Sequence, residues 1–319
     1  MSLPRDIDRA VEFVLGVQPK RVGLRYKPHK PCLLLAVLDL FEAEVLDENQ
    51  IEFDSTPRLV ETFNSYFDAV ALPNEKKAAC WPFVHLASDK FWHLEPVLGC
   101  EQAVREKPSK GGVTDKWVRE NVRHVRLNSS FFSTCSNAHA RNVIREAVVE
   151  KFFSDQSEEI RQIIKQSVAS IRYELALRNS ESSVEPHTPP NKATRSASFR
   201  RIVLDAYDYR CAATGWRIVL PSVNLIEAAH LIPWSESNDD TVQNGMALTP
   251  TYHRAMDANL IAPSAEGVWK ISEILRESRI KDFEPFRELE GKKVILPTKI
   301  ASRPKDEALQ YRELRLRDK

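Results

Sequence analysis

Several features are scarce in this sequence of 319 residues, and each absence excludes a class of protein. No apolar run reaches the length of about 18 residues that a transmembrane helix needs, so we expect no membrane span. The first residues include acids and lack a long apolar core, which argues against a secretory signal. Lys and Arg number 46 against 45 Asp and Glu, so the chain is not basic throughout. Five scattered cysteines without CxxC spacing predict reduced, mostly buried thiols in a cytoplasmic protein.

The composition and length predict a globular chain with about two domains. Hydrophobic residues make up 42% and charged residues 29%, which are ordinary values for proteins with packed cores. Residues 179–198 differ, because they hold five Ser, three Pro and few apolar side chains. Such a segment cannot bury enough surface to order itself, so we interpret it as a flexible linker. It separates a domain at 1–178 from a domain at 199–319, and we expect an α+β fold class.

The predicted N-terminal domain is mixed but rich in helix. Apolar residues recur every three or four positions in four segments, which predicts helices over 31–46, 57–70, 138–153 and 158–177. A short strand is predicted at 50–54, and two short strands around a turn at 81–95.

The C-terminal domain contains a predicted sequence of strand, polar loop and helix. The apolar run 223–234 suits a strand, and 235–240 is polar. Thr249 is a plausible N-cap and Pro250 a plausible first helical residue, which predicts a helix over 250–258.

Four polar residues in this layout form a candidate catalytic set. His230 ends the strand, Asn244 closes the loop, and His253 and Asp257 share one face of the helix because they are four residues apart. An imidazole near neutral pH can take the proton from an attacking water. An imidazole and a carboxylate can together hold one divalent cation, which screens a phosphate and stabilises a leaving oxygen. The pattern is therefore typical of phosphodiester hydrolysis.

These residues lie in stretches that resemble a known family. EAAHLIPW followed by NGMALTPTYHRAMDANL resembles the HNH nuclease motif of the ββα-metal fold, and the tail LPTKIASRPKDEALQYRELRLR is similar to that of its restriction-associated branch. The resemblance implies that His230 is the general base, that Asn244 orients the site, and that His253 and Asp257 bind Mg²⁺ or Mn²⁺.

The chain departs from the HNH pattern at two places. Ala229 stands where many HNH enzymes have a metal-binding Asp, and Glu227, on the same face of the strand, is the candidate to assist. Cys211 and Thr214 stand where zinc-binding relatives have a pair of cysteines, so we expect no structural zinc.

The N-terminal domain contains two local basic stretches. Residues 20–30 hold five Lys or Arg and no acid, and residues 107–126 hold six against two acids. Basic segments beside aromatic residues suit contact with nucleic-acid phosphates, although a solvated charged face is the alternative.

The order of features in residues 5–154 resembles the sulfur-binding domain, which binds DNA carrying a phosphorothioate linkage. The resemblance rests on four segments: YKPHKPCLLLAVLDL, WPFVHLASDKFWHL, KPSKGG and ARNVIREAVVEKFF. The resemblance implies that His29 and Lys30 form a cationic pair and that Trp81 and Pro82 form an aromatic–Pro wall for sulfur, with His85 as a further lining residue. It also implies that Lys107 and Ser109 provide a basic loop with a polar contact. Lys30 and Lys107 stand where Arg is common, and Trp81 where Tyr is common.

Together the two resemblances predict a modification-dependent, McrA-like (type IV-like) restriction endonuclease. Its partner would be double-stranded DNA carrying phosphorothioates. Cleavage of both strands with one site per chain favours a homodimer. Two alternatives stay open. The N-terminal domain could bind another DNA modification or a protein partner, or the protein could be a non-catalytic DNA-binding protein on an HNH scaffold.

Overall fold

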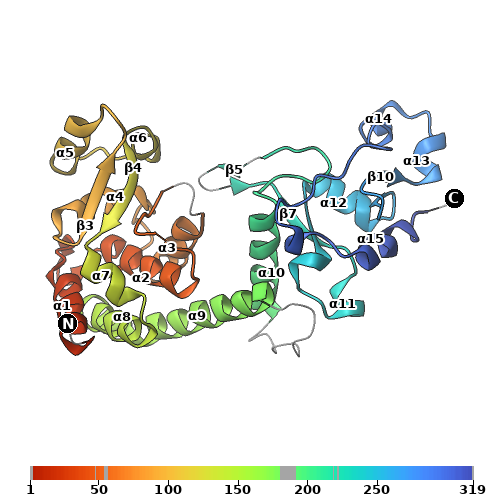
Figure 1. The fold of residues 1–319 in the computed structure, drawn as a ribbon. Helices are drawn as coiled ribbons and strands as arrows, with labels where there is room; N and C mark the ends of the chain where they lie inside the picture. The colour runs from red at the N-terminus through yellow and green to blue at the C-terminus, as the bar shows by residue number, and fades with distance from the viewer. Residues whose placement is uncertain are drawn as a thin grey trace. The chain divides into compact units, whose positions relative to one another are not determined.

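The computed structural model describes residues 3–46, 48–53, 57–179, 192–217, 219–220 and 223–317 (Figure 1). The chain divides into two compact units, Met1–Ile171 and Arg172–Lys319. Each unit has its own cluster of buried apolar side chains. In the described residues, no helix is both long enough and apolar enough to cross a membrane.

The boundary between the units differs from the predicted one. It lies inside helix α9 (Ser157–Asn179), so the end of α9 belongs to the C-terminal unit. Of the predicted linker, residues 180–191 lie outside the described residues. Its end is helical, because α10 (Lys192–Ala206) begins before residue 199. Buried Phe199, Ile202 and Val203 give α10 an apolar face, and this packing explains why the helix belongs to the folded unit.

The N-terminal unit is built around α2 (His29–Glu42), which is buried along almost its whole length. A helix that is apolar on all sides must be surrounded by other elements. α2 packs against the predicted helix α3 (Pro57–Val70) and against α8 (Ala138–Phe152), while α1 (Leu3–Gly16) packs on α8 and α7 (Ser129–Cys135). The remaining short elements of this region are β1 (Arg21–Val22), β2 (Arg25–Tyr26), α6 (Asp115–Asn121), η1 (Leu86–Ser88) and η2 (Ser154–Gln156).

Segment 81–95 shows one wrong and one correct strand prediction. β3 (Trp92–Pro96) pairs antiparallel with β4 (Val122–Leu127), and Ile51 adds a single bridge to Val125. The first predicted strand is instead helix α4 (Cys80–His85). Its apolar residues are too few to distinguish a strand from one and a half helical turns, and packing against α2 decides for the helix.

A buried ion network joins the helices of the N-terminal unit. Arg145 of α8 contacts Asp39 of α2 at 2.9 Å, and Arg141 contacts Glu42 at 3.0 Å. Asp39 also accepts hydrogen bonds from Tyr66 and from Ser167 of α9. Burial raises the pKa of the Asp39 carboxyl, and the Arg145 charge opposes that shift. These contacts fix α2, whose first residues belong to the predicted DNA-binding set.

The cysteines agree with the prediction of free thiols. All five are free, and only Cys100 is not fully buried. Burial raises the pKa of Cys80 and of Cys135 to about 12, so these thiols stay protonated and unreactive at neutral pH.

The core of the C-terminal unit places two antiparallel strands and one helix together, as the sequence predicts. β7 (Glu227–His230) pairs with β8 (Gly245–Leu248), and α12 (Pro250–Asp257) packs on both. A Cβ atom at position 245 would lie 2.3 Å from the Val203 side chain, so the close approach of α10 requires glycine there.

Several further elements surround this core. β9 (Ile261–Pro263) pairs with β10 (Trp269–Ile271), and α15 (Asp306–Glu313) packs against β9. The predicted strand over 223–234 is two short strands, β6 (Val223–Asn224) and β7, rather than one. The other elements are β5 (Val219–Leu220), α11 (Trp234–Ser237), α13 (Glu273–Glu277), α14 (Glu284–Arg287), η3 (Val242–Asn244), η4 (Lys281–Phe283) and η5 (Ile300–Ser302).

Candidate active site

His230 lies at the end of β7 and is held from two sides. Its Nε2 atom is 2.9 Å from Oδ1 of Asp240. Its ring stacks on Phe199 of α10, with centroids 3.6 Å apart and an angle of 7° between the planes. The imidazole is 21% exposed, so it is both fixed and accessible. The sequence pattern predicts a role for His230 but not for Asp240 or Phe199.

Asn244 is buried and braces the loop between β7 and β8. Its side-chain oxygen accepts a hydrogen bond from the Ile232 amide at 2.8 Å. Its side-chain nitrogen donates to the carbonyls of Ile232 and Asp239, both at 2.9 Å. One amide therefore closes the loop that follows His230 and keeps the end of β7 in place.

His253 and Asp257 of α12 form a hydrogen-bonded pair, with Nε2 and Oδ2 3.3 Å apart. Glu227 of β7 contacts the other ring nitrogen of His253 at 2.8 Å. The hydrogen bond with Asp257 raises the pKa of His253 against the effect of burial, and Glu227 adds to the rise. Burial opposes ionisation of Asp257, but His253 and Arg312 outweigh it and lower the pKa of the carboxyl.

Arg312 of α15 connects the backbone of His230 to the Asp257 carboxylate, a link that the sequence did not predict. One of its nitrogens donates to the His230 carbonyl at 2.7 Å and to Oδ1 of Asp257 at 3.0 Å. Its other terminal nitrogen donates to the Met256 carbonyl at 3.2 Å. The guanidinium is buried, and its planar fork suits three acceptors at once. The only sequence signal was the resemblance of the tail to that of HNH relatives.

The donor set of His253 and Asp257 fits a divalent ion that keeps most of its water ligands. In the described ranges, no three His, Cys, Asp or Glu side chains gather into a ready metal site. Two donor atoms 3.3 Å apart can nevertheless both reach one ion at bond lengths of about 2.0–2.2 Å. Asp257 is 54% exposed, which leaves room for water and phosphate oxygens. Mg²⁺ commonly binds through one or two protein ligands in this way.

Two of the N-terminal residues predicted to contact DNA, His29 and Trp81, lie against each other. His29 begins α2 and stacks on Trp81 of α4, with ring centroids 5.4 Å apart. The indole nitrogen of Trp81 donates to the Val113 carbonyl at 3.1 Å, and the Lys76 ammonium lies 5.7 Å from the indole centroid. The partly exposed indole of Trp81 therefore lies beside the exposed cation of Lys76 and the imidazole of His29.

His29 does not have the cationic character that the sequence resemblance implies. It is 8% exposed, and its Nε2 atom lies 2.9 Å from the Lys76 carbonyl. Burial lowers the pKa of His29, so the ring is neutral at neutral pH. Lys30 is a cation, but it is paired with Asp89 at 2.9 Å.

His85, Lys107 and Ser109 lie on two helices. His85 ends α4, and burial followed by the Lys30 charge lowers its pKa. Lys107 and Ser109 occupy the last turn of α5 (Glu101–Lys110), not the basic loop that the sequence suggested. The Lys107 ammonium lies 5.1 Å from the ring centroid of Trp117 and has no carboxylate partner among the described residues. Ser109 donates to the Glu106 carbonyl.

Pro82 is buried inside α4, so it does not present a surface wall. A pocket of about 360 Å³ in this unit lies beside β3 and α5, and neither Trp81 nor Pro82 lines it. The aromatic–Pro wall that the resemblance implies for these two residues is therefore reduced to the exposed part of Trp81.

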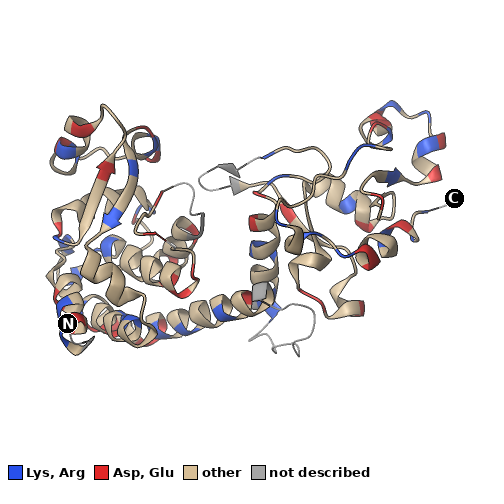
Figure 2. Ribbon diagram, in the orientation of Figure 1, with Lys and Arg blue, Asp and Glu red and all other residues tan. Residues whose placement is uncertain are grey.

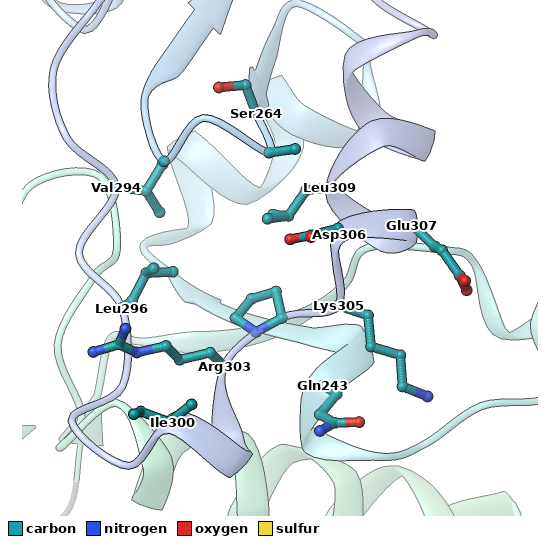
Figure 3. A pocket seen from close by; sticks show the side chains of 13 residues that line it. Gln243, Ser264, Val294, Leu296, Ile300, Arg303, Lys305, Asp306, Glu307 and Leu309 are labelled. Carbon is teal, nitrogen blue, oxygen red and sulfur yellow. The ribbon is translucent and has the colours of Figure 1, made fainter. Parts of the chain in front are cut away.

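A larger pocket of about 700 Å³ lies in the C-terminal unit (Figure 3). Its lining includes none of the four predicted catalytic side chains. Arg303 and Lys305 line it together with Asp306 and Glu307, so its charges are mixed. The same mixture holds in each unit as a whole, where Lys and Arg alternate with Asp and Glu along the helices (Figure 2). Neither the pocket nor the charge distribution singles out a ligand.

Comparisons with known proteins agree with the C-terminal site. Among solved structures, a chain described as the sulfur binding domain of SprMcrA complexed with phosphorothioated DNA is similar at 15% identity and a TM-score of 0.38; the match covers 52% of this chain and 97% of that one. No curated protein matches the chain. Residues 211–262 match a family described as HNH endonuclease, and the matched segment contains β7, β8 and α12. The C-terminal unit thus carries an HNH endonuclease domain.

Proposed function

We propose that this protein is a modification-dependent DNA restriction endonuclease that hydrolyses phosphodiester bonds with a divalent metal. The observation that carries the proposal is the placement of His230, Asn244, His253 and Asp257 around one strand pair and helix. A base, a loop brace and a metal-binding pair are the parts that hydrolysis of a charged phosphate ester needs.

In this proposal the chain's own residues divide the work. His230 takes a proton from water as the water oxygen bonds to phosphorus and the bond to the 3′ oxygen breaks. Solvent water protonates the departing 3′ oxygen, which leaves 5′-phosphate and 3′-hydroxyl ends. Asn244 keeps the imidazole aimed by holding the loop behind it. His253 and Asp257 would hold Mg²⁺ or Mn²⁺, which supplies charge stabilisation at the phosphate and the leaving oxygen.

The N-terminal unit is proposed to bind double-stranded DNA that carries phosphorothioates. The exposed part of Trp81 offers apolar surface to a sulfur atom, which is larger and less hydrated than oxygen. Lys107 has no carboxylate partner in the described part of the chain, and it lies in the last turn of α5, so it can contact a phosphate. His29, neutral and stacked, would position Trp81 rather than neutralise charge.

Two further proposals follow from this function. With one catalytic site per chain, cleavage of both strands favours a homodimer.

The buried free thiols suit the reducing cytoplasm, where the DNA substrate would be found.

The deciding experiment is digestion of matched phosphorothioate and plain duplexes with Mg²⁺, Mn²⁺ or EDTA. We expect cleavage with either metal, none with EDTA, and faster cleavage of the modified duplex. Binding without any cleavage would favour the non-catalytic alternative. Cleavage without preference would leave the nuclease in place and favour an N-terminal unit that binds another modification or a partner.

A further inference from the structure

We propose that Asp240 is a positioning residue that sets which nitrogen of His230 acts as the base. The inference rests on the proposed function, because it assigns a partner to the proposed general base. Asp240 lies in the loop before η3, ten residues beyond His230, and its Oδ1 atom contacts Nε2 of the imidazole at 2.9 Å.

The Asp240 carboxylate is itself held on both oxygens. It is 3% exposed. One guanidinium nitrogen of Arg195 donates to Oδ1 at 2.8 Å and to Oδ2 at 2.9 Å. The Tyr173 hydroxyl is 3.2 Å from Oδ2. These donors come from α9 and α10, so the position of Asp240 is fixed by helices outside the segment that matches the HNH family.

This geometry determines the tautomer of the imidazole. A carboxylate only accepts hydrogen bonds, so the contact at 2.9 Å places the ring proton of neutral His230 on Nε2. Nδ1 then carries the lone pair and is the atom that can take a proton from water. When it does so, the nearby negative charge of Asp240 stabilises the imidazolium that forms.

α10 contributes a second restraint from the same face. Arg195 and Phe199 are four residues apart, so their side chains lie one helical turn from each other. Arg195 holds the carboxylate, and Phe199 stacks on the His230 ring, which limits its rotation. The base is therefore oriented by a hydrogen bond at its edge and a ring against its face.

The adjacent Asp239 provides a matched control. It occupies the same loop, its Oδ1 accepts from the Thr241 amide at 2.7 Å, and its Oδ2 faces Lys305 at 3.6 Å. It thus supports the loop but has no side-chain contact with His230 among the described interactions. A purely structural role for Asp240 predicts that any loss of rate in its variant comes with a loss of thermal stability and leaves the His230 tautomer unexplained.

The test uses the full chain with two kinds of measurement. The first is ¹⁵N NMR of histidine-labelled wild-type protein, in which we expect the His230 proton on Nε2; a proton on Nδ1 would overturn the proposal. The second is steady-state cleavage by the near-isosteric variant Asp240→Asn and by Asp239→Asn. We expect Asp240→Asn to lower kcat by about a hundredfold or more with KM for DNA unchanged, as expected when an orienting carboxylate is lost, and Asp239→Asn to stay within about threefold.

The outcomes separate this proposal from the proposed function. If wild-type protein cuts no DNA, the nuclease proposal fails, while the tautomer of His230 still tests the role of Asp240. If Asp240→Asn cuts within about threefold of wild type, Asp240 is not a positioning residue, even though the nuclease assignment holds. Thermal unfolding of both variants shows whether a lost rate reflects a lost fold.

Discussion

His230 in the C-terminal unit and His29 in the N-terminal unit differ in exposure, although each lies at an end of a regular element. His230 keeps one edge accessible while Asp240 and Phe199 fix its position. His29 is 8% exposed, and its Nε2 atom is already used by the Lys76 carbonyl. Catalysis needs a group that is held and reachable, whereas recognition of a DNA backbone needs exposed charge. The geometry of His230 fits its proposed role in catalysis, whereas in the N-terminal unit fewer residues fit the proposed DNA contact than the resemblance implies.

The largest expected effect comes from removing the proposed base. We expect His230→Ala to lower the cleavage rate by about a hundredfold to ten-thousandfold, the usual worth of a general base. DNA affinity should not change, because the base acts on water and not on the bound strand. Single-turnover cleavage and a binding titration measure the two effects. His139→Ala, at an exposed position of α8, is the control. Cleavage by His230→Ala within about tenfold of wild type would assign the base elsewhere.

The metal pair should give the next largest effect. We expect His253→Ala and Asp257→Ala each to lose cleavage, and a higher Mg²⁺ concentration to restore part of it in at least one of them. Loss of a residue that only hydrogen-bonds to a metal ligand typically lowers metal affinity by about 10- to 100-fold. Loss of a ligand itself should lower it by at least as much. Cleavage is followed across a Mg²⁺ titration. Full activity of the double variant would rule out the two-ligand arrangement and point to Glu227.

These two predictions concern the part of the molecule that the sequence could reveal. The ββα segment is short, so His230, Asn244, His253 and Asp257 fall within 28 residues at fixed spacings. Strand pairing and the helical period of 3.6 residues then bring them together. The N-cap position of Thr249 and the helix start at Pro250 were predictable for the same local reason, although the Thr249 side chain makes no capping hydrogen bond.

What the sequence could not reveal is long-range. Arg312 reaches the His230 carbonyl across 82 residues, and Arg195 reaches Asp240 across 45. No spacing rule connects such pairs, because loop lengths and helix docking decide them. In the N-terminal unit, tertiary packing also makes a helix of the first strand predicted within 81–95 and buries Pro82 in it. The resemblance named side chains there without fixing their exposure.

A third prediction tests whether the N-terminal unit distinguishes sulfur from oxygen. We expect Trp81→Ala to bring the ratio of affinities for phosphorothioate and plain duplex to about one, because an apolar contact discriminates by desolvation. The dependence of binding on salt should stay unchanged, since no charge is lost. Paired binding titrations across salt measure both quantities, and Trp216→Ala, an exposed Trp of the other unit, is the control. A ratio that survives Trp81→Ala would place sulfur recognition on other residues.

The smallest effects compare Lys107 and His29, two of the residues predicted to contact DNA. Lys107→Gln should lower the slope of log affinity against log salt by about 0.9, the value for one phosphate contact. His29→Gln should leave that slope unchanged at neutral pH, because burial lowers the pKa of His29 and a neutral ring releases no counterion. Both variants are titrated against plain duplex over the same salt range. His29→Gln does disturb the stack on Trp81, so its affinity can fall while the slope stays constant. If the two variants change the slope equally, His29 is a cation in the complex, and DNA binding must then supply the charge that offsets the desolvation of a buried imidazolium.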